Sequence, residues 1–312
     1  SLMQPHYRYK TSLEGHDSSI MAMAFSPDGN YLAAGSENGT LIVYAKMVRG
    51  WVPLSRFVDL SPLTSIAWHP LNKRILYCGF ESGDVHTLLL PPTKESDSRT
   101  WTDTTDGPIA CIAHSFLDDI LAVGSGEDVY LIRYQMANSN ASWKTKLPLP
   151  HPPKRELPNN RGSTLTSRAT SAHFFTINTH LVVTYVDHGV VCWNTKDLSI
   201  VWEIKPSGGK LCVFNAAVDH ALICSSGGSA LSLDERLIVL SKFADGFECY
   251  TLSNQQRNYT VDVSTSESVP TSVLFDANGS IMFGGPSGAA YVTDGTPPVI
   301  TQTLRYEGKF PL

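Results

Sequence analysis

The 312-residue sequence has little charge, no close pair of cysteines and no long apolar run. Asp, Glu, Lys and Arg make up 17% of it and the formal net charge is −5, so it lacks the positive charge typical of duplex-binding domains. Its six cysteines include no CxxC pair, which removes the common zinc and dithiol signatures. No apolar run approaches the roughly 18 residues of a membrane-spanning helix, and the first residues lack a signal-peptide core. We therefore expect an intracellular protein, cytoplasmic or nuclear, without a membrane partner.

The sequence also lacks the short motifs of common catalytic and cofactor sites. It contains no GxxxxGK phosphate loop, no GxGxxG after a strand, no HExxH, no EF-hand loop and no GxSxG elbow. We accordingly expect no enzyme activity, no cofactor and no metal. Cysteines 78, 111, 192 and 249 lie inside apolar runs, and we interpret them as small buried thiols.

What the sequence does contain is a repeat. The stretch SIMAMAFSPDGNYLAAGSENGTLIVY (19–44) has three apolar runs separated by the turn signals SPDGN and SENG. Its middle run recurs as YLAAGS, ILYCGF, ILAVGS, LVVTYV, LIVLSK and IMFGGP, starting at residues 31, 75, 120, 181, 237 and 281, that is 44, 45, 61, 56 and 44 residues apart. A fourth, more polar run follows each copy. Short runs rich in β-branched and aromatic residues, bounded by Gly, Pro, Asn and Asp, predict strands. Four strands per period predict an all-β propeller.

The copies define a single domain over residues 1–312. We expect blades at about 16–60, 61–106, 107–152, 166–206, 207–264 and 269–308, with a long loop at 136–168 and an extra hairpin within 207–227. Six blades are countable, and a seventh could be present in incomplete form. Residues 6–13 and 298–306 both look like the outer strand of the last blade, and the sequence alone leaves that choice open.

The period, the four strands and the Gly15-His16 pair before the first strand resemble WD40 repeats. The Trp position of that family is held by Tyr44, Leu88, Trp193, Tyr250 and Thr293. The resemblance implies a structural polar network that joins the His, a Ser or Thr of the second strand, the Asp of the next turn and the Trp. The matching residues are His16, Ser36, Asn38 and Tyr44 in the first blade, and Thr184, Asp187 and Trp193 in the fourth.

Acidic residues recur in the turns between second and third strands. In a propeller these turns share one face, so the carboxylates would form an acidic ring able to attract a basic peptide. Asp and Gly are also good turn formers, which is the simpler interpretation. The candidates for partner binding are Glu37, Glu81, Asp84, Glu127, Asp128, Asp187 and Asp245. Three histidines, at 69, 114 and 173, follow equivalent first strands, and we interpret them as structural, with a metal site as the alternative.

These patterns predict a non-catalytic protein-interaction scaffold that presents a propeller face to a protein or basic peptide. One alternative is a propeller hydrolase or isomerase, which needs convergent carboxylates or histidines at the central channel. Another is a nucleic-acid-associated adaptor that uses the basic loop 144–168. The prolines and sparse aromatics of that loop make nucleic acid an unlikely partner.

Overall fold

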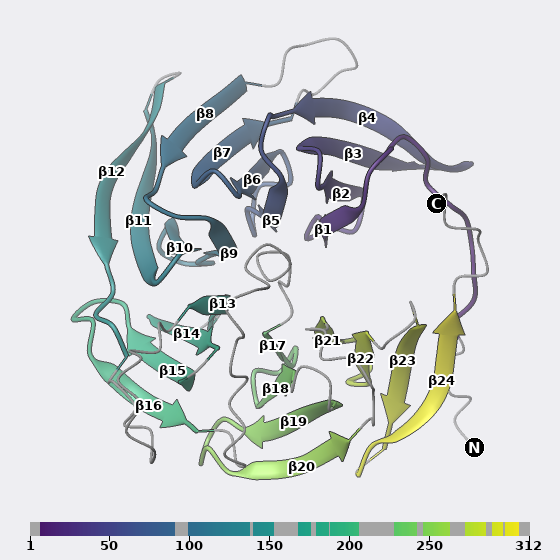
Figure 1. Cartoon of the computed structure of the whole chain (residues 1–312), viewed down its shortest axis with the longest axis vertical. Helices are drawn as coiled ribbons and strands as arrows, with labels where there is room; N and C mark the ends of the chain where they lie inside the picture. The colour runs from purple at the N-terminus through teal and green to yellow at the C-terminus, as the bar shows by residue number, and fades with distance from the viewer. Residues whose placement is uncertain are drawn as a thin grey trace, which may run out of the picture. The chain divides into compact units, whose positions relative to one another are not determined.

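The computed structural model describes residues 7–90, 99–137, 140–152, 168–175, 179–186, 188–205, 228–241, 246–262, 272–284, 289–295 and 297–305. Within these residues the chain forms 24 β-strands and no helix. The strands make six sheets of four, and each sheet joins its strands in chain order with antiparallel pairing (Figure 1). The repeat read from the sequence is therefore a repeat of four-stranded sheets.

The sheets follow one another along the chain. The first contains β1 (Ile20–Phe25), β2 (Tyr31–Ser36), β3 (Thr40–Met47) and β4 (Gly50–Val58). The second contains β5 (Leu63–Trp68), β6 (Ile75–Phe80), β7 (Asp84–Leu89) and β8 (Arg99–Thr104). The third contains β9 (Ile109–His114), β10 (Ile120–Ser125), β11 (Asp128–Ala137) and β12 (Asn140–Pro148).

The fourth sheet contains β13 (Ala169–Phe174), β14 (His180–Tyr185), β15 (Gly189–Asn194) and β16 (Ile200–Ile204). The fifth contains β17 (Ser229–Leu231), β18 (Leu237–Ser241), β19 (Gly246–Thr251) and β20 (Arg257–Asp262). The sixth contains β21 (Val273–Phe275), β22 (Ile281–Gly284), β23 (Ala289–Asp294) and β24 (Val299–Arg305).

The chain divides into two compact units. The larger unit is Glu14–Ser226 with the first four sheets, and the smaller unit is Ser1–Leu13 with Gly227–Leu312 and the last two sheets. In the larger unit the first strands β1, β5, β9 and β13 lie on the inner side and the fourth strands on the outer side (Figure 1). Small and apolar residues fill the inner strands because neighbouring sheets approach each other most closely there.

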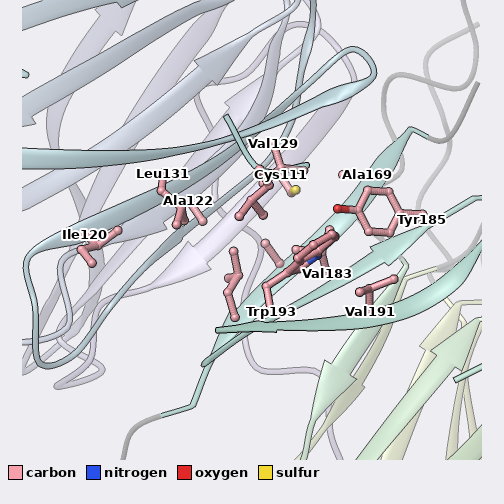
Figure 2. Packing of buried hydrophobic residues seen from close by; sticks show 13 residues of the cluster. Cys111, Ile120, Ala122, Val129, Leu131, Ala169, Val183, Tyr185, Val191 and Trp193 are labelled. Carbon is pink, nitrogen blue, oxygen red and sulfur yellow. The ribbon is translucent and has the colours of Figure 1, made fainter. Parts of the chain in front are cut away.

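The hydrophobic core consists of separate layers between successive sheets. One layer joins the first and second sheets, another the second and third, a third the third and fourth, and one in the smaller unit joins the fifth and sixth. Figure 2 shows the layer in which Ile120, Val129 and Leu131 of the third sheet pack near Val183 and Trp193 of the fourth. Cysteines 78, 111, 192 and 249 are free and buried, as predicted.

Close sheet packing depends on glycine in three second strands. A Cβ on Gly35 would lie 2.3 Å from a Leu63 methyl carbon, and one on Gly79 would lie 2.3 Å from Ile109 Cγ2. At Gly124 a Cβ would approach Cys111 Sγ to 2.7 Å and Ala169 Cβ to 3.2 Å. Each glycine therefore leaves the space into which the next first strand packs.

A repeated bulge marks the third and fourth strands of five sheets. The pairing shifts at Val43/Tyr44, Arg133/Tyr134, Cys192/Trp193, Cys249/Tyr250 and Val292/Thr293. Four of the five residues that the sequence places at the family's Trp position are the second members of these pairs. In the third sheet, where no residue was assigned to the Trp position, the bulge identifies Tyr134 as the equivalent residue. A bulge bends its strand, and it recurs at the same position of the repeat in these five sheets.

The structure settles which segment forms the outer strand of the sixth sheet. Residues 299–305 are β24, whereas residues 7–13 form no strand. Tyr7 is nevertheless bound there, because its N–H donates to Gln302 Oε1 at 2.9 Å and its carbonyl accepts from Gln302 Nε2 at 2.7 Å. The Tyr7 hydroxyl donates to Asp276 Oδ2 at 2.5 Å. The side chain of Gln302 thus replaces a strand partner for Tyr7.

The long loop expected at 136–168 begins later than predicted. Strands β11 and β12 continue to Ala137 and from Asn140 to Pro148, and the pairing runs from Tyr130–Pro148 to Ala137–Asn140. Residues 153–167 and the hairpin expected within 207–227 lie outside the described residues.

Candidate functional site

The first sheet contains most of the polar network that the WD40 resemblance implies. Ser36, the last residue of β2, lies with its Oγ 3.1 Å from His16 Nδ1 and donates to Asn38 Oδ1 at 2.7 Å. Asn38 in turn donates from Nδ2 to Asp17 Oδ1 at 2.7 Å. Burial lowers the pKa of His16, so the ring is neutral at pH 7. The network joins the segment before β1 to the turn before β3.

Tyr44 takes the Trp position but makes a different bond. Its hydroxyl donates to the carbonyl of Glu14 at 2.9 Å instead of reaching Ser36. The intervening Gly15 has a φ of 123° and a Cβ there would lie 2.9 Å from Ile42 Cδ1. The Gly of the Gly15-His16 pair is thus required by both its conformation and the close approach of β3.

In the fourth sheet two of the three expected members of the network, Thr184 and Trp193, are described, and both are buried. Thr184 is buried in β14, and its carbonyl accepts a hydrogen bond from the Thr170 hydroxyl at 3.3 Å. Trp193 is 1% exposed and belongs to the core layer of Figure 2. Asp187 lies outside the described residues, so its proposed place in the network remains a prediction.

The third sheet has a polar anchor that the sequence analysis missed. Ser125, the last residue of β10, has its Oγ 2.7 Å from Thr105 Oγ1 and 2.7 Å from the Gly107 carbonyl oxygen. Thr105 Oγ1 lies 2.9 Å from the Gly83 carbonyl oxygen and 3.0 Å from that of Gly107, so the two hydroxyl protons are shared among these acceptors. Thr105 precedes Ser125 by 20 residues, the separation of His16 from Ser36. That spacing was the signal that could have revealed the pair.

The five described candidates for partner binding lie at one edge of the larger unit. Glu37, Glu81 and Glu127 occupy the turns that lead into third strands, and Asp84 and Asp128 are the first residues of β7 and β11. These turns are tied to the start of their own sheets, since Glu37 N–H donates to the Ser19 carbonyl and Glu81 N–H to the Pro62 carbonyl, both at 2.9 Å. Asp187 and Asp245 lie outside the described residues.

Three further carboxylates reach the same edge. They come from the segments that enter first strands, whereas the candidates predicted from the sequence belong to the turns between second and third strands. Asp59 N–H donates to the Gly39 carbonyl at 3.0 Å, which places it beside the turn of the first sheet. The acidic edge is therefore the set Asp17, Glu37, Asp59, Glu81, Asp84, Asp106, Glu127 and Asp128. These eight carboxylates belong to the first three sheets, and Arg168, before β13 of the fourth sheet, lies beside the corresponding turn, because its carbonyl accepts the N–H of Val186 at 3.0 Å.

Neighbouring groups at the acidic edge influence one another. Asp59 Oδ2 lies 3.8 Å from His86 Nε2, and burial lowers the pKa of His86 although Asp59 and Asp84 oppose that shift. Tyr130 donates to Asp128 Oδ2 at 3.2 Å, and burial together with Asp128 raises the pKa of Tyr130. Glu37, Asp106 and Glu127 are exposed, so their charge is available to a partner in solution.

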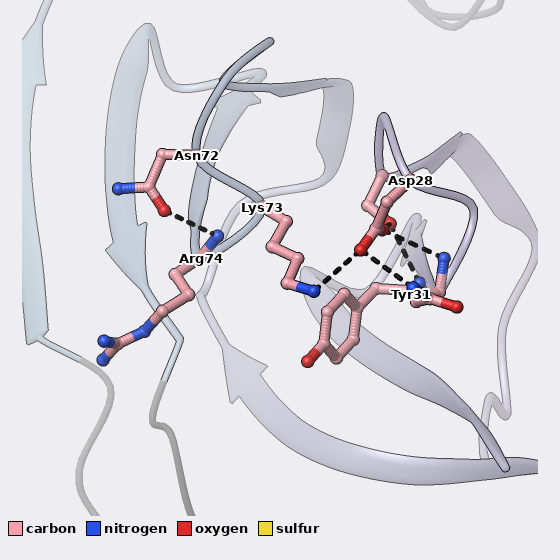
Figure 3. A network of polar contacts seen from close by, with 7 residues as sticks. Asp28, Tyr31, Asn72, Lys73 and Arg74 are labelled. Atoms are coloured by element: carbon pink, nitrogen blue, oxygen red, sulfur yellow. Dashed lines mark hydrogen bonds and ion pairs between the residues drawn. The ribbon is translucent and has the colours of Figure 1, made fainter.

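The other edge of the larger unit carries the turns between first and second strands. Lys73 donates to Asp28 Oδ2 at 2.9 Å and so links the turns of the first two sheets, while Asn72 caps the N–H of Arg74 (Figure 3). Lys73 holds the pKa of Asp28 far below its usual range, with help from Ser26 and Asn30.

Two of the three histidines expected to be structural meet at this edge. His69 Nδ1 accepts the N–H groups of Leu71 and Asn72, both at 3.1 Å, so the ring caps the turn after β5. The ring centroids of His69 and His114 lie 4.3 Å apart. Burial, and to a lesser extent the nearby His69, lower the pKa of His114 to about 4. His173 belongs to β13 of the fourth sheet and is half-buried.

The smaller unit contains a buried carboxylate that the sequence analysis did not predict. Glu248 in β19 is 1% exposed and accepts the Tyr250 hydroxyl at 2.6 Å. Arg257 Nη1 lies 3.3 Å from the other oxygen of Glu248. Both oxygens are satisfied, as a buried charge requires, which gives the group a structural role.

Comparison with known structures decides the fold. The model of the WD domain, G-beta repeat matches residues 7–44, which contain His16 and strands β1 to β3. The crystal structure of the Myceliophteria thermophila Cps50 (Swd1) β-propeller domain superposes with a TM-score of 0.67 at 13% identity, over 93% of this chain and 88% of that one. The chain has the WD40 β-propeller fold. Its six sheets are the blades.

Other relatives agree with this fold. The WD40 propeller domain of Doa1 superposes with a TM-score of 0.67 at 14% identity, over 95% of this chain and 85% of that one. The ribosome biogenesis protein erb1 of Botryotinia fuckeliana (strain B05.10) is 25% identical over 97 residues, which are 30% of this chain and 13% of that protein. The chain thus matches only a small part of that curated relative. Among the described residues of the propeller, no helix has the length and hydropathy needed to cross a membrane.

Proposed function

We propose that this WD40 propeller is a non-catalytic scaffold that binds a protein or basic peptide on its acidic edge. The observation that carries the proposal is the gathering of eight carboxylates from three successive blades. The carboxylates lie on stiff turns, so the binding of a basic partner would cost little conformational entropy in these turns. Clustered charge of one sign also accelerates the association of an oppositely charged partner.

The inner strands support a binding role over a hydrolase or isomerase. The described first strands read IMAMAF, LTSIAW, IACIAH, ATSAHF, SAL and VLF; none of them carries a carboxylate, and their two histidines, His114 and His173, lie at the last and the next-to-last position of their strands. A propeller enzyme of the kind considered above would need acidic or histidine side chains to converge there. The WD40 fold is generally used for binding proteins, which agrees with this interpretation.

A matched pair of variants tests the acidic edge. Glu37→Gln combined with Glu127→Gln removes two exposed charges there, and Asp118→Asn combined with Asp197→Asn removes two from the other edge. Fluorescence polarisation with labelled Lys- and Arg-rich peptides measures binding by the purified chain. We expect binding that weakens with salt, that falls several-fold in the first variant and that is unchanged in the second. Equal binding by both variants would contradict the proposal.

A second candidate is a role in ribosome assembly, with a nuclear location. It is favoured by the match to the ribosome biogenesis protein erb1, over a segment that is 13% of that protein. The basic loop 144–168, most of which lies outside the described residues, would be the segment for an RNA-associated partner. Co-sedimentation of the tagged chain with pre-ribosomal particles, with and without Lys146, Lys154 and Arg155 changed to Gln, tests this role. Sedimentation only with free proteins would exclude it.

A further inference from the structure

His69, His114 and Asp119 form a compact group at the edge opposite the acidic one. His69 follows β5, His114 ends β9, and Asp119 lies in the turn before β10. One ligand atom from each lies within 4.8 Å of the others. His69 Nε2 and Asp119 Oδ1 are 3.6 Å apart. Two imidazoles and a carboxylate are a donor set that zinc accepts, with a fourth position left to water.

One of the two ring nitrogens of His114 makes no hydrogen bond within the described structure. Its Nδ1 lies 2.6 Å from the carbonyl of Ser115, and a carbonyl only accepts, so the ring carries its proton on Nδ1. The lone pair is therefore on Nε2. That atom is buried and has no hydrogen-bond partner. Metal-binding histidines are commonly oriented in this way, with one ring N–H donated to a carbonyl and the other nitrogen on the metal.

We propose that His69, His114 and Asp119 bind a divalent transition-metal ion of the zinc class. Tetrahedral bonds of about 2.0 to 2.1 Å place ligand atoms roughly 3.3 Å apart, so His69 and Asp119 are already near the required separation. Asp119 has a side chain that is 72% exposed and can turn toward the metal, whereas the two rings are held by packing. The stacking of His114 on Tyr77, with centroids 5.3 Å apart, keeps its ring in place.

His69 must change its hydrogen bonds to join this site. Its Nδ1 accepts the N–H groups of Leu71 and Asn72, so the neutral metal-free ring carries its proton on Nε2, toward Asp119. When zinc binds Nε2, the proton of the neutral ring moves to Nδ1, which then no longer accepts the two N–H groups; alternatively the ring turns over and releases them. In both cases the amides of Leu71 and Asn72 change their environment. The amide resonances of Leu71 and Asn72 therefore report the binding of metal at this site and not at another site.

Zinc titration of the metal-stripped full chain by calorimetry tests the proposal. We expect one equivalent to bind with micromolar or tighter affinity. Asp119→Asn should weaken binding about tenfold or more, and His114→Phe should abolish it while keeping the stack on Tyr77. Asp118→Asn changes the neighbouring exposed carboxylate and should leave the affinity unchanged. Magnesium, which prefers oxygen ligands, should not compete.

Three results would overturn the proposal. One is the absence of zinc binding below millimolar concentration in the wild-type chain. Another is equal binding by the wild type and Asp119→Asn, which would place the ion elsewhere, for example at His151 and Asp128, which lie 3.5 Å apart. The third is zinc binding that leaves the Leu71 and Asn72 amide resonances unchanged. Asp119→Asn decides the case if His114→Phe does not fold, because Asn tolerates the φ of 46° at this position.

Discussion

The first three blades fill the same position, the last residue of the second strand, in two different ways. In the first and third blades it is a serine, Ser36 or Ser125, that bonds to a side chain 20 residues earlier. In the second blade it is Phe80, which is fully buried and packs against Phe57 and His86 with centroids 6.4 and 4.8 Å away. Ser36 and Ser125 thus tie their blades to the segments that enter them, whereas Phe80 packs against β4 of the preceding blade. A polar and an apolar anchor can therefore occupy the same position of the repeat.

Removal of the apolar anchor should have the largest effect. Phe80→Ala deletes a fully buried ring between the first and second blades and should lower the free energy of unfolding by about 3–5 kcal/mol. Urea denaturation followed by tryptophan fluorescence measures this. A loss below about 1 kcal/mol would mean that Phe80 does not anchor the blade.

Removal of a polar anchor should cost less. Ser125→Ala deletes the donor to Thr105 and to the Gly107 carbonyl, yet Thr105 still reaches that carbonyl, so we expect a loss of about 1–2 kcal/mol. The control is Thr105→Ser, which keeps the hydroxyl group and should cost less than Ser125→Ala. A neutral Ser125→Ala would show that the bonds of this anchor add nothing to stability.

The His86 ring beside Phe80 should make the second blade sensitive to acid. Burial holds the pKa of His86 below its usual 6.5, so the unfolded chain binds the proton more readily. The stabilisation that comes from neutral His86 is fully present above about pH 6.5 and is lost as the pH falls below that value. His86→Leu should reduce the loss between pH 7.5 and 5, measured as the shift of the urea midpoint. His151→Gln, at a side chain that is 65% exposed, is the control and should leave the loss unchanged.

The smallest change concerns the anchor of the first blade. Asn38→Asp restores the residue that WD40 repeats carry in this turn, but the new carboxylate would face Asp17, which now accepts from Asn38. Stability should change by less than about 1 kcal/mol. The pKa of His16 should rise, because a nearby negative charge favours the protonated ring. Titration of the His16 ring protons by NMR measures the shift, and a fall in the pKa would refute this account of the network.

Much of the fold could be predicted because a blade is a local structure. Apolar runs, turn residues and a period near 44 identify strands that pair with their neighbours in the chain, and the structure has the six four-stranded sheets that this repeat predicts. The start of the loop at 136 was wrong, because no residue signals how far the β11–β12 hairpin extends. The anchor of Thr105 and Ser125 was missed, because neither residue resembles the Gly-His signature even though their spacing repeats it.

The candidate sites divide in the same way. The turn carboxylates were found from their place in the repeat, but Asp17, Asp59 and Asp106 were not, since they belong to a different kind of turn. The histidines after first strands were recognised as equivalent positions. That only His69 and His114 meet, and that Asp119 joins them, depends on how two blades pack and on the path of one turn.

By itself the sequence determined the four-stranded repeat and the order of its strands, because hydrogen bonds between adjacent strands and turn chemistry act over a few residues. It also determined the charge that the turns carry. Only the tertiary structure decided which turns of successive blades lie together, which nitrogen of His114 has no hydrogen-bond partner, and which segment forms the outer strand of the sixth blade. These features depend on side-chain contacts between residues up to 295 positions apart, and no local pattern encodes such contacts.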